Sequence, residues 1–329
     1  MIISRSPFRV SFFGGGTDFP AFYRRHGGAT LLTTLDRYCY ISLHRLSPLH
    51  AHRFRASYSK TELVMKPSEF QHPLIRECLL MLGIKQGLDI SHAADLPGRT
   101  GLGSSSAFVV GLLNALHALR GESRTAEDLA REAIEVERNR VGDPGGHQDQ
   151  YAAAYGGLLR LDFGADGAVR VKGIPLAPDR RRELERHLML FYLGAERCST
   201  AISAEQQRRV RSNTAALLKM RALVDAAERA LCGPRPLSEF GRLLHESWLL
   251  KKTLSRGISN PPVDDAYAEA RRAGALGGKL LGAGGGGFLL VFARPSAHAA
   301  VRKRLSRLQE IPLAMGTEGS RIVFRSDET

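Results

Sequence analysis

Residues 96–114, LPGRTGLGSSSAFVVGLLN, decide how the rest of the chain is interpreted. Three glycines and three consecutive serines stand directly before an apolar run that is typical of a buried helix. Small residues let backbone N–H groups approach an anion, and the N-terminus of the following helix adds unpaired donors and the positive end of its dipole. Serine hydroxyls can also ligate a hard cation such as Mg²⁺. The stretch therefore predicts a phosphate and metal cradle, and not only a capping serine.

Other glycine-rich motifs fit this chain less well. A Walker A loop needs a lysine after its second glycine, and no lysine follows Gly101 or Gly103. A nucleophile elbow needs a second glycine four residues on, which Gly103 lacks. The later run GAGGGG, 282–287, matches the dinucleotide fingerprint, but it leads into the strand-like FLLVF instead of a helix. We interpret this run as a tight turn beside the active cleft.

Composition and charge narrow the class of protein. The chain has 329 residues and is 43% hydrophobic, which fits one large or two ordinary globular domains. No segment approaches the roughly 18 apolar residues of a membrane span, and no leader pattern opens the chain, so we expect a cytoplasmic protein without a membrane partner. The net charge of +14 suits nucleic acid, an acidic surface or a phosphorylated substrate. Because no basic stripe is interleaved with aromatic residues, and the arginine clusters fall on solvated helix faces, we expect no nucleic-acid partner.

Hydrophobic periodicity predicts an α+β chain whose first half is rich in strands. The patterns indicate strands near residue 10, over 38–44 and over 88–94, and a helix over 73–84. Thr125 and Asp128 form a capping-box pattern that opens a further helix over about 126–139.

A glycine- and proline-rich loop, VGDPGGHQDQ, and a hairpin-like segment over 158–171 precede a second half in which the pattern is mainly helical. The elements predicted there are strands over 187–194, 288–292 and 320–324 and helices near 201–232, 236–253, 263–273 and 296–308. We place the boundary between residues 165 and 185, which divides the chain into domains 1–175 and 176–329.

Two carboxylates stand out in the first domain. Glu137 borders the apolar stripe of the helix over 126–139, and an unpaired charge there would be expensive. It is either a metal ligand or the partner of an arginine, and the residues alone favour the ion pair. Asp149 lies in the GGHQDQ loop, where it can accept a proton from a hydroxyl or simply form a turn. His147 beside it is either a competing base or a neutral loop histidine.

The N-terminal stretch SRSPFRVSFFGGGTDF supplies two further candidates. Arg9, on a predicted strand, is suited to stabilise a transferring phosphate, and Asp18, just past a triple glycine, is suited to accept hydrogen bonds from sugar hydroxyls. Each alone is an ordinary surface residue. Together with a phosphate cradle and two more carboxylates, they are the parts that phosphoryl transfer requires.

Three stretches, SPFRVSFFGGGTDF, LPGRTGLGSSSA and KLLGAGGGGF, resemble in that order the three motifs of the galactokinase, homoserine kinase, mevalonate kinase and phosphomevalonate kinase (GHMP) superfamily. The middle one, P-x-x-x-G-L-G-S-S-x-A, is the most specific. The resemblance spans nearly the whole chain and implies a two-domain α+β fold. Its N-terminal domain would be like the second domain of ribosomal protein S5 and its C-terminal domain ferredoxin-like, with ATP, Mg²⁺ and substrate in the cleft between them.

The GGGTD version of the first motif, the GDPGGHQDQ loop and the stretch ISNPPVDDAYAEARRAGALGGKLLGAGGGG resemble the heptose-phosphate kinase branch. That branch implies phosphorylation of the anomeric hydroxyl of D-glycero-D-manno-heptose 7-phosphate to the 1,7-bisphosphate. Galactokinases carry GEHTD at the first motif, which argues against galactose. Two alternatives stay open, namely a kinase of an unphosphorylated sugar such as fucose and a non-catalytic sensor of a nucleotide or sugar phosphate. The presence of both carboxylates argues against the sensor.

The resemblance also implies a role for each matching position. Asp149 would be the catalytic aspartate, Arg9 would stabilise the transferring group, and Glu137 with Ser105 would hold Mg²⁺. The implied ATP contacts are Pro97, Gly98, Gly101, Leu102, Gly103, Ser104, Ser105 and Ser106. The implied substrate contacts are Gly16, Thr17, Asp18, His147, Arg197, Gly284 and Gly285, although the segment around Arg197 matches the branch only loosely. The expected partner is a small sugar phosphate, and a homodimer is one option for the oligomeric state.

Overall fold

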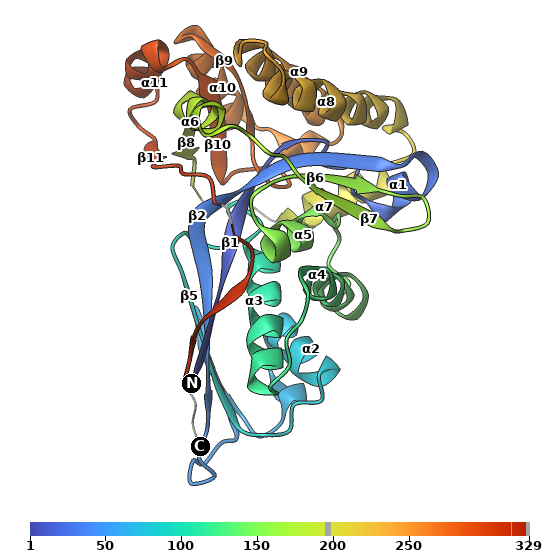
Figure 1. Ribbon diagram of the computed structural model, residues 1–329, viewed down its shortest axis with the longest axis vertical. Coiled ribbons are helices and arrows are strands. Elements are labelled where there is room, and N and C mark those ends of the chain that lie inside the picture. The colour runs from blue at the N-terminus through green and yellow to red at the C-terminus, as the bar shows by residue number, and fades with distance from the viewer. Residues whose placement is uncertain (195–198, 317, 327–329) are drawn as a thin grey trace.

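The computed structural model describes residues 1–194, 199–316 and 318–326, which form two β-sheets with helices packed against them (Figure 1). The first sheet has the strand order β12-β1-β2-β5-β3-β4, and β6 pairs with β2 and with β7. Every pairing is antiparallel except that of β3 with β5. The strands are β1 (Ile2–Phe13), β2 (Gly28–Arg45), β3 (Phe54–Ser57), β4 (Thr61–Val64), β5 (Leu88–Ala94), β6 (Leu158–Phe163), β7 (Val169–Gly173) and β12 (Arg321–Arg325).

Some helices of the first half pack directly on this sheet, and others pack against those helices. They are α1 (Pro20–His26), α2 (Pro73–Met81), α3 (Ser104–Leu119), α4 (Ala126–Ile134), a π-helical turn η2 (Glu135–Arg140) and α5 (Gln148–Tyr155), with a 3₁₀ turn at Pro67–Glu69. As its apolar composition predicts, α3 is buried nearly all round and lies against β1 and β2. Gly111 brings the helix backbone close to the sheet, since the Ser4 hydroxyl donates to its carbonyl oxygen at 2.7 Å. This packing places the N-terminus of α3 beside the C-terminal half of β1.

The second sheet is antiparallel and has the order β11-β8-β10-β9. Its strands are β8 (Leu188–Tyr192), β9 (Ala275–Leu280), β10 (Phe288–Ala293) and β11 (Gln309–Ile311). The helices of this half are α6 (Pro178–His187), α7 (Ser199–Arg208), α8 (Thr214–Cys232), α9 (Ser238–Thr253), α10 (Pro261–Arg272) and α11 (His298–Arg304), with 3₁₀ turns at Arg256–Ile258 and Pro295–Ala297. Helix α9 packs on β9 and alongside α8.

The predicted domain boundary separates the two sheets except for one strand. Strand β7 ends at Gly173 and α6 begins at Pro178, so the chain passes from the first sheet to the second half near residue 175. Strand β12, however, returns to the first sheet and pairs with β1 from Ile2↔Arg325 to Arg5↔Arg321. We therefore propose domains 1–175 and 176–329 with β12 as a strand that the second segment contributes to the first sheet.

Two sequence-based predictions were wrong in detail, and some elements were not predicted. The GGHQDQ segment is not all loop, because α5 begins at Gln148 and holds Asp149 in its first turn. The helix predicted over 201–232 is two helices separated by turns at 209–213. Strand β9 was not predicted, because glycines have low strand propensity. They are needed there, since a Cβ at Gly277 would lie 1.9 Å from the Gly241 carbonyl oxygen of α9.

Candidate active site

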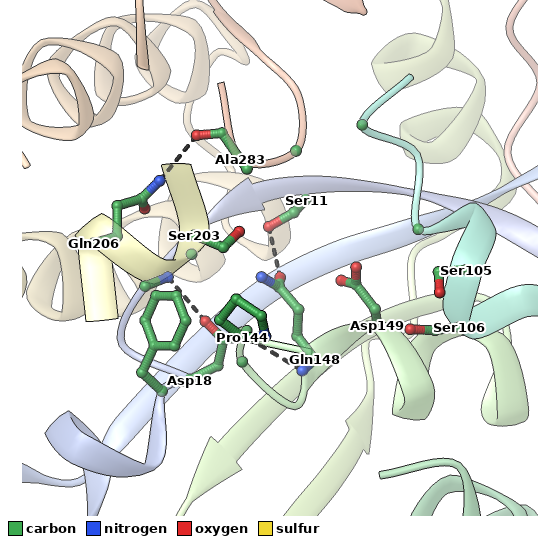
Figure 2. Close-up of a pocket in the computed structure, with 18 of the residues that line it drawn as sticks. Ser11, Asp18, Ser105, Ser106, Pro144, Gln148, Asp149, Ser203, Gln206 and Ala283 are labelled. Atoms are coloured by element: carbon green, nitrogen blue, oxygen red, sulfur yellow. Dashed lines mark hydrogen bonds between the residues drawn. The ribbon is translucent and has the colours of Figure 1, made fainter. Parts of the chain in front are cut away.

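A cavity of about 200 Å³ opens where loops and helices of the two halves meet (Figure 2). The first half contributes β1, the triple-glycine turn after it, the loop leading into α3, η2 and the start of α5. The second half contributes α7, α9, β9 and the start of the GAGGGG loop. The cavity therefore collects all three motifs that the sequence analysis singled out.

Strand β1 reaches this cavity through an irregular stretch of pairing. Its register against β2 shifts between Pro7 and Arg9 and again between Ser11 and Phe13. Such shifts re-aim side chains and are common beside active sites. Both Arg9 and Ser11 line the cavity, and the Arg9 backbone N–H donates at 2.9 Å to the carbonyl oxygen of Leu102 in the loop before α3. The strand and the loop are thus tied together at the site.

Arg9 and Asp149 form a bidentate pair. Arg9 Nε lies 2.8 Å from Asp149 Oδ1, and Arg9 Nη2 lies 2.7 Å from Oδ2. The Arg9 side chain is 7% exposed and that of Asp149 21%, so the carboxylate retains access to the cavity. Arg9 Nη1 donates at 2.5 Å to the carbonyl oxygen of Gly101. A fork of this kind fixes the carboxylate in one orientation.

Glu137 lies on the π-helical turn and is 1% exposed. Its carboxylate accepts hydrogen bonds from the hydroxyls of Ser105 and Ser106, both at 2.7 Å, and from the Gln150 amide. The predicted choice was between an arginine partner and a metal; among the described residues, the observed partners are these hydroxyls and the amide. A π-helical turn inside a helix often marks a functional site, and here it carries the carboxylate to the start of α3.

These oxygens fit Mg²⁺ when phosphate is present. Hard cations take carboxylate and hydroxyl oxygens, which Glu137 and Ser105 supply. Within the described part of the chain, no group of three or more His, Cys, Asp or Glu side chains converges as a metal site. Mg²⁺ usually completes its coordination with substrate phosphates and water, so one carboxylate at a phosphate cradle is a sufficient protein contribution.

The cradle depends on glycine at the loop before α3. Gly101 has φ +83° and Gly103, the N-cap of α3, has φ +71°. A Cβ on Gly101 would lie 2.4 Å from the Leu281 carbonyl oxygen, and one on Gly282 would lie 2.4 Å from the Gly101 Cα. The loop before α3 and the start of the GAGGGG loop are therefore in close backbone contact, and the first residues of α3 line the cavity beside them.

On the other side of the cavity, Asp18 is 2% exposed. Its carboxylate accepts from the backbone N–H groups of Gly16 at 2.8 Å and Gln148 at 3.2 Å. Burial raises the pKa of Asp18, and the nearby Asp149 charge raises it further, although the two N–H groups act in the opposite direction. The Gln148 side chain accepts from the Ser11 hydroxyl at 2.7 Å, so the α5 terminus is held to β1 (Figure 2).

The sequence analysis missed several lining residues of the second half. Lys279 is 2% exposed, and its Nζ lies 3.1 Å from the Phe12 carbonyl oxygen. Burial lowers the pKa of Lys279 well below its usual range, and the charges of Lys251 and Arg9 add to this. The sequence signal that could have identified Lys279 is its place next to the apolar residues that precede GAGGGG. Ser203 and Gln206 of α7 gave none; the Gln206 amide donates at 2.9 Å to the Ala283 carbonyl oxygen.

The predicted residues divide into two groups. Those that line the cavity are Arg9, Gly16, Asp18, Gly101, Gly103, Ser104, Ser105, Ser106, Glu137 and Asp149. Those that do not line it are Pro97, Gly98, Leu102, Thr17, His147, Gly284 and Gly285, and Arg197 lies outside the described residues.

The second group has visible packing roles. Leu102 is a core residue, and the Thr17 hydroxyl donates to the Gly14 carbonyl oxygen at 2.8 Å. His147 Nδ1 lies 3.2 Å from the Tyr23 hydroxyl. Burial, followed by the charges of Arg138 and Arg24, lowers the pKa of His147 to about 4, so its imidazole is neutral at pH 7. The backbone of Gly285 donates to Ile258 at 3.1 Å and supports the GAGGGG loop from behind.

Comparisons with known proteins agree with this arrangement. Residues 72–157 match the GHMP kinases N terminal domain, and residues 223–310 match the GHMP kinases C terminal domain. The chain is 28% identical to a D-glycero-alpha-D-manno-heptose 7-phosphate kinase of Campylobacter jejuni over 94% of each chain. It is 30% identical to a mevalonate kinase of Methanothermobacter thermautotrophicus over 66% of this chain and 68% of that one.

Among solved structures, a D-glycero-D-manno-heptose 1-phosphate kinase from Bacteroides thetaiotaomicron superposes with a TM-score of 0.79 at 24% identity. The superposition covers 99% of this chain and 100% of the other. The chain belongs to the GHMP kinase family. It is an ATP-dependent kinase, and the predicted family, enzyme class and two-domain α+β fold are confirmed. Within the described ranges, no helix is long and apolar enough to span a membrane.

Proposed function

We propose that this kinase acts on a sugar, transferring the γ-phosphoryl group of ATP to the anomeric hydroxyl of D-glycero-D-manno-heptose 7-phosphate. The product would be the 1,7-bisphosphate. The observation that carries the proposal is the Arg9–Asp149 pair, which lines the same cavity as the Ser105–Glu137 set. Similarity to a heptose 7-phosphate kinase over 94% of each chain supports the choice of sugar.

Asp149 is the proposed acceptor for the proton of the attacking hydroxyl. Arg9 holds both of its oxygens, so the carboxylate presents one fixed face to the cavity. A positioned carboxylate orients the hydroxyl and takes its proton as the new bond forms. The Arg9 guanidinium offsets negative charge that develops beside it. Asp18, held by two backbone N–H groups, is the proposed partner of a second sugar hydroxyl.

The phosphate end of the cavity is the proposed ATP site. The backbone from Gly101 to Ser106 offers N–H groups to the phosphates, and Glu137 with Ser105 would hold Mg²⁺. When bound, ATP supplies the phosphoryl group and Mg²⁺ neutralises charge on it. The chain's own contribution is to orient the two reactants and to keep Glu137 in place through the Ser106 and Gln150 contacts.

The other partners and the location stay predictions. We expect a small phosphorylated sugar as the partner, no nucleic acid and no membrane, a cytoplasmic enzyme, and a homodimer as one option. Size-exclusion chromatography with light scattering decides the oligomeric state.

The deciding experiment measures ADP release with Mg²⁺-ATP against heptose 7-phosphate, mannose 6-phosphate, fucose, galactose and no sugar, with the phosphorylated position assigned by ³¹P NMR. Turnover confined to heptose 7-phosphate, with a new anomeric phosphate, supports the proposal. Turnover only on fucose moves the enzyme to a kinase of free sugars. Nucleotide binding without turnover on any sugar in the panel favours the sensor.

A substitution tests the mechanism separately. Asp149→Asn should bind ATP but lose at least about a hundredfold in kcat, since a positioned acid or base contributes roughly that much or more. Asp166→Asn, in an exposed turn, is the matched control and should retain activity. An Asp149→Asn enzyme as fast as the unmodified one would rule out the proposed role.

A further inference from the structure

A second cavity, of about 270 Å³, lies between α1 and the end of α7. Four arginines line it, namely Arg24 and Arg25 from α1, Arg208 from α7 and Arg211 from the turn that follows. All four side chains are exposed, and the two pairs come from segments more than 180 positions apart in the chain. The sequence analysis placed the arginine clusters, of which Arg208 and Arg211 are part, on solvated helix faces, but the fold brings these two to α1.

Among the residues that the structure describes, this cluster has little compensating negative charge, although the Glu205 carboxylate interacts electrostatically with Arg208. None of the four arginines forms an ion pair there. Helix α1 has no acidic residue, and the acidic residue of α7 is Glu205. Its carboxylate accepts from the Ser255 hydroxyl at 2.7 Å and from Arg209 at 3.4 Å. Like charges gathered around one cavity repel, so an anion bound there would be favoured.

The four-arginine cavity adjoins the active site along both helices. Phe19 and Gln206 line the active cavity, and the next residues, Pro20 and Gln207, line the second one. On α7, Ser203 faces the active cavity, and Gln207 follows one helical turn later, a rise of about 6 Å. A molecule that extends along this face can present a hydroxyl to the first cavity and an anionic group to the second.

We propose that the four-arginine cavity binds the phosphate monoester at the far end of the sugar phosphate substrate. The inference rests on the function proposed above and adds the residues that select a phosphorylated sugar over a free one. Guanidinium groups pair with phosphate through two parallel N–H donors, which favours arginine over lysine for this task. In a seven-carbon sugar the anomeric hydroxyl and the terminal phosphate are at opposite ends of the molecule, which suits a site made of two adjoining cavities.

The test compares a double variant, Arg25→Gln with Arg211→Gln, with a control that removes the same charge elsewhere. Arg45→Gln with Arg307→Gln is suitable, since both arginines are exposed and line neither cavity. Hydrogen bonds to a charged group are worth about tenfold or more in affinity each. The KM for heptose 7-phosphate should therefore rise at least tenfold in the double variant. The preference for heptose 7-phosphate over unphosphorylated heptose should fall by a similar factor, whereas the control keeps it.

Inorganic phosphate distinguishes a site for the phosphate group of the substrate from a separate site for a free phosphate effector. As a mimic of the substrate phosphate, it should inhibit competitively against heptose 7-phosphate and bind the double variant more weakly in calorimetry. An unchanged KM and preference in the double variant would overturn the proposal. Phosphate that alters turnover of free heptose without competing would also overturn it, in favour of a separate effector site. If the enzyme phosphorylates only a free sugar, the function fails, while calorimetry with phosphate still decides whether the cavity binds an anion.

Discussion

Replacing Gly101 by alanine should impair catalysis out of proportion to its effect on stability. The new Cβ would lie 2.4 Å from the Leu281 carbonyl oxygen, whereas ordinary contact begins near 3.4 Å, so one backbone must move by about 1.0 Å. Arg9 Nη1 donates to the Gly101 carbonyl, and Arg9 in turn holds Asp149. The displacement is therefore passed to the proposed catalytic carboxylate.

Two contributions to the effect can be separated. A left-handed φ of +83° costs an alanine about 1 kcal/mol in folding, whether or not there is a clash. A misplacement of about 1 Å at an active site costs about a hundredfold in rate, or about 2.7 kcal/mol in activation free energy. Gly121 has φ +76° with nothing within 4 Å of its Cβ position, so Gly121→Ala carries the backbone strain without the clash.

The assay pairs urea unfolding with ADP release on the best sugar of the panel. Gly121→Ala should lose about 1 kcal/mol of unfolding free energy and keep its kcat/KM. Gly101→Ala should lose at least as much stability and also about a hundredfold in kcat/KM. If the two variants have equal kcat/KM, the contact between the loops does not position the site, and the reasoning is refuted.

Three further predictions concern buried charges. Glu137→Gln should raise the Mg²⁺ concentration for half-maximal activity about tenfold. Glu135→Gln, at a side chain that is 44% exposed, is the control and should not raise it. Equal Mg²⁺ titrations of the two variants would contradict the proposed ligand. Because burial raises the pKa of Asp18, the stability it contributes is present below the unfolded pKa and is lost as pH rises through the folded pKa. As the pH rises from 4 to 7, the unfolding free energy of Asp18→Asn in urea should therefore increase relative to that of the unmodified chain, by at most about 1.4 kcal/mol per pH unit. A difference between the two proteins that does not change with pH would refute this. Burial lowers the pKa of Lys279, so the unfolded state binds its proton more readily and stability rises with pH below the unfolded pKa. Lys279→Met should therefore be more stable than the unmodified chain at pH 7 by a margin that shrinks towards pH 10, and a margin independent of pH would contradict the assignment.

The sequence predicted the parts of this site better than their connections. The three motifs, the buried helix α3 and the strand with Arg9 all have strong local signals, since small residues and apolar periodicity are visible in short windows. The Glu137 contacts to Ser105 and Ser106 join helices more than 30 positions apart, and no local pattern contains such a contact.

Where local and tertiary preferences conflict, the prediction failed. Pro144, Gly145 and Gly146 indicate a loop, yet α5 begins only two positions later, at Gln148, which is hydrogen-bonded to Asp18 and Ser11. The glycines of β9 are untypical of a strand, so the pattern did not predict one. They are present because α9 approaches the strand too closely for a Cβ. Lys279 looks like a surface residue by type, but it is buried, and its Nζ donates to the Phe12 carbonyl oxygen of β1.

The return of β12 to β1 has a consequence for the order in which the protein is made. During translation the chain emerges from its N-terminus, so β1 is exposed to the cell long before residues 321–325 leave the ribosome. Until then, the backbone of β1 from Ile2 to Arg5 lacks the partner on that edge, and an open strand edge can pair with other chains. A nascent chain stalled before residue 321 should therefore depend on chaperones, even though its three kinase motifs have already been synthesised.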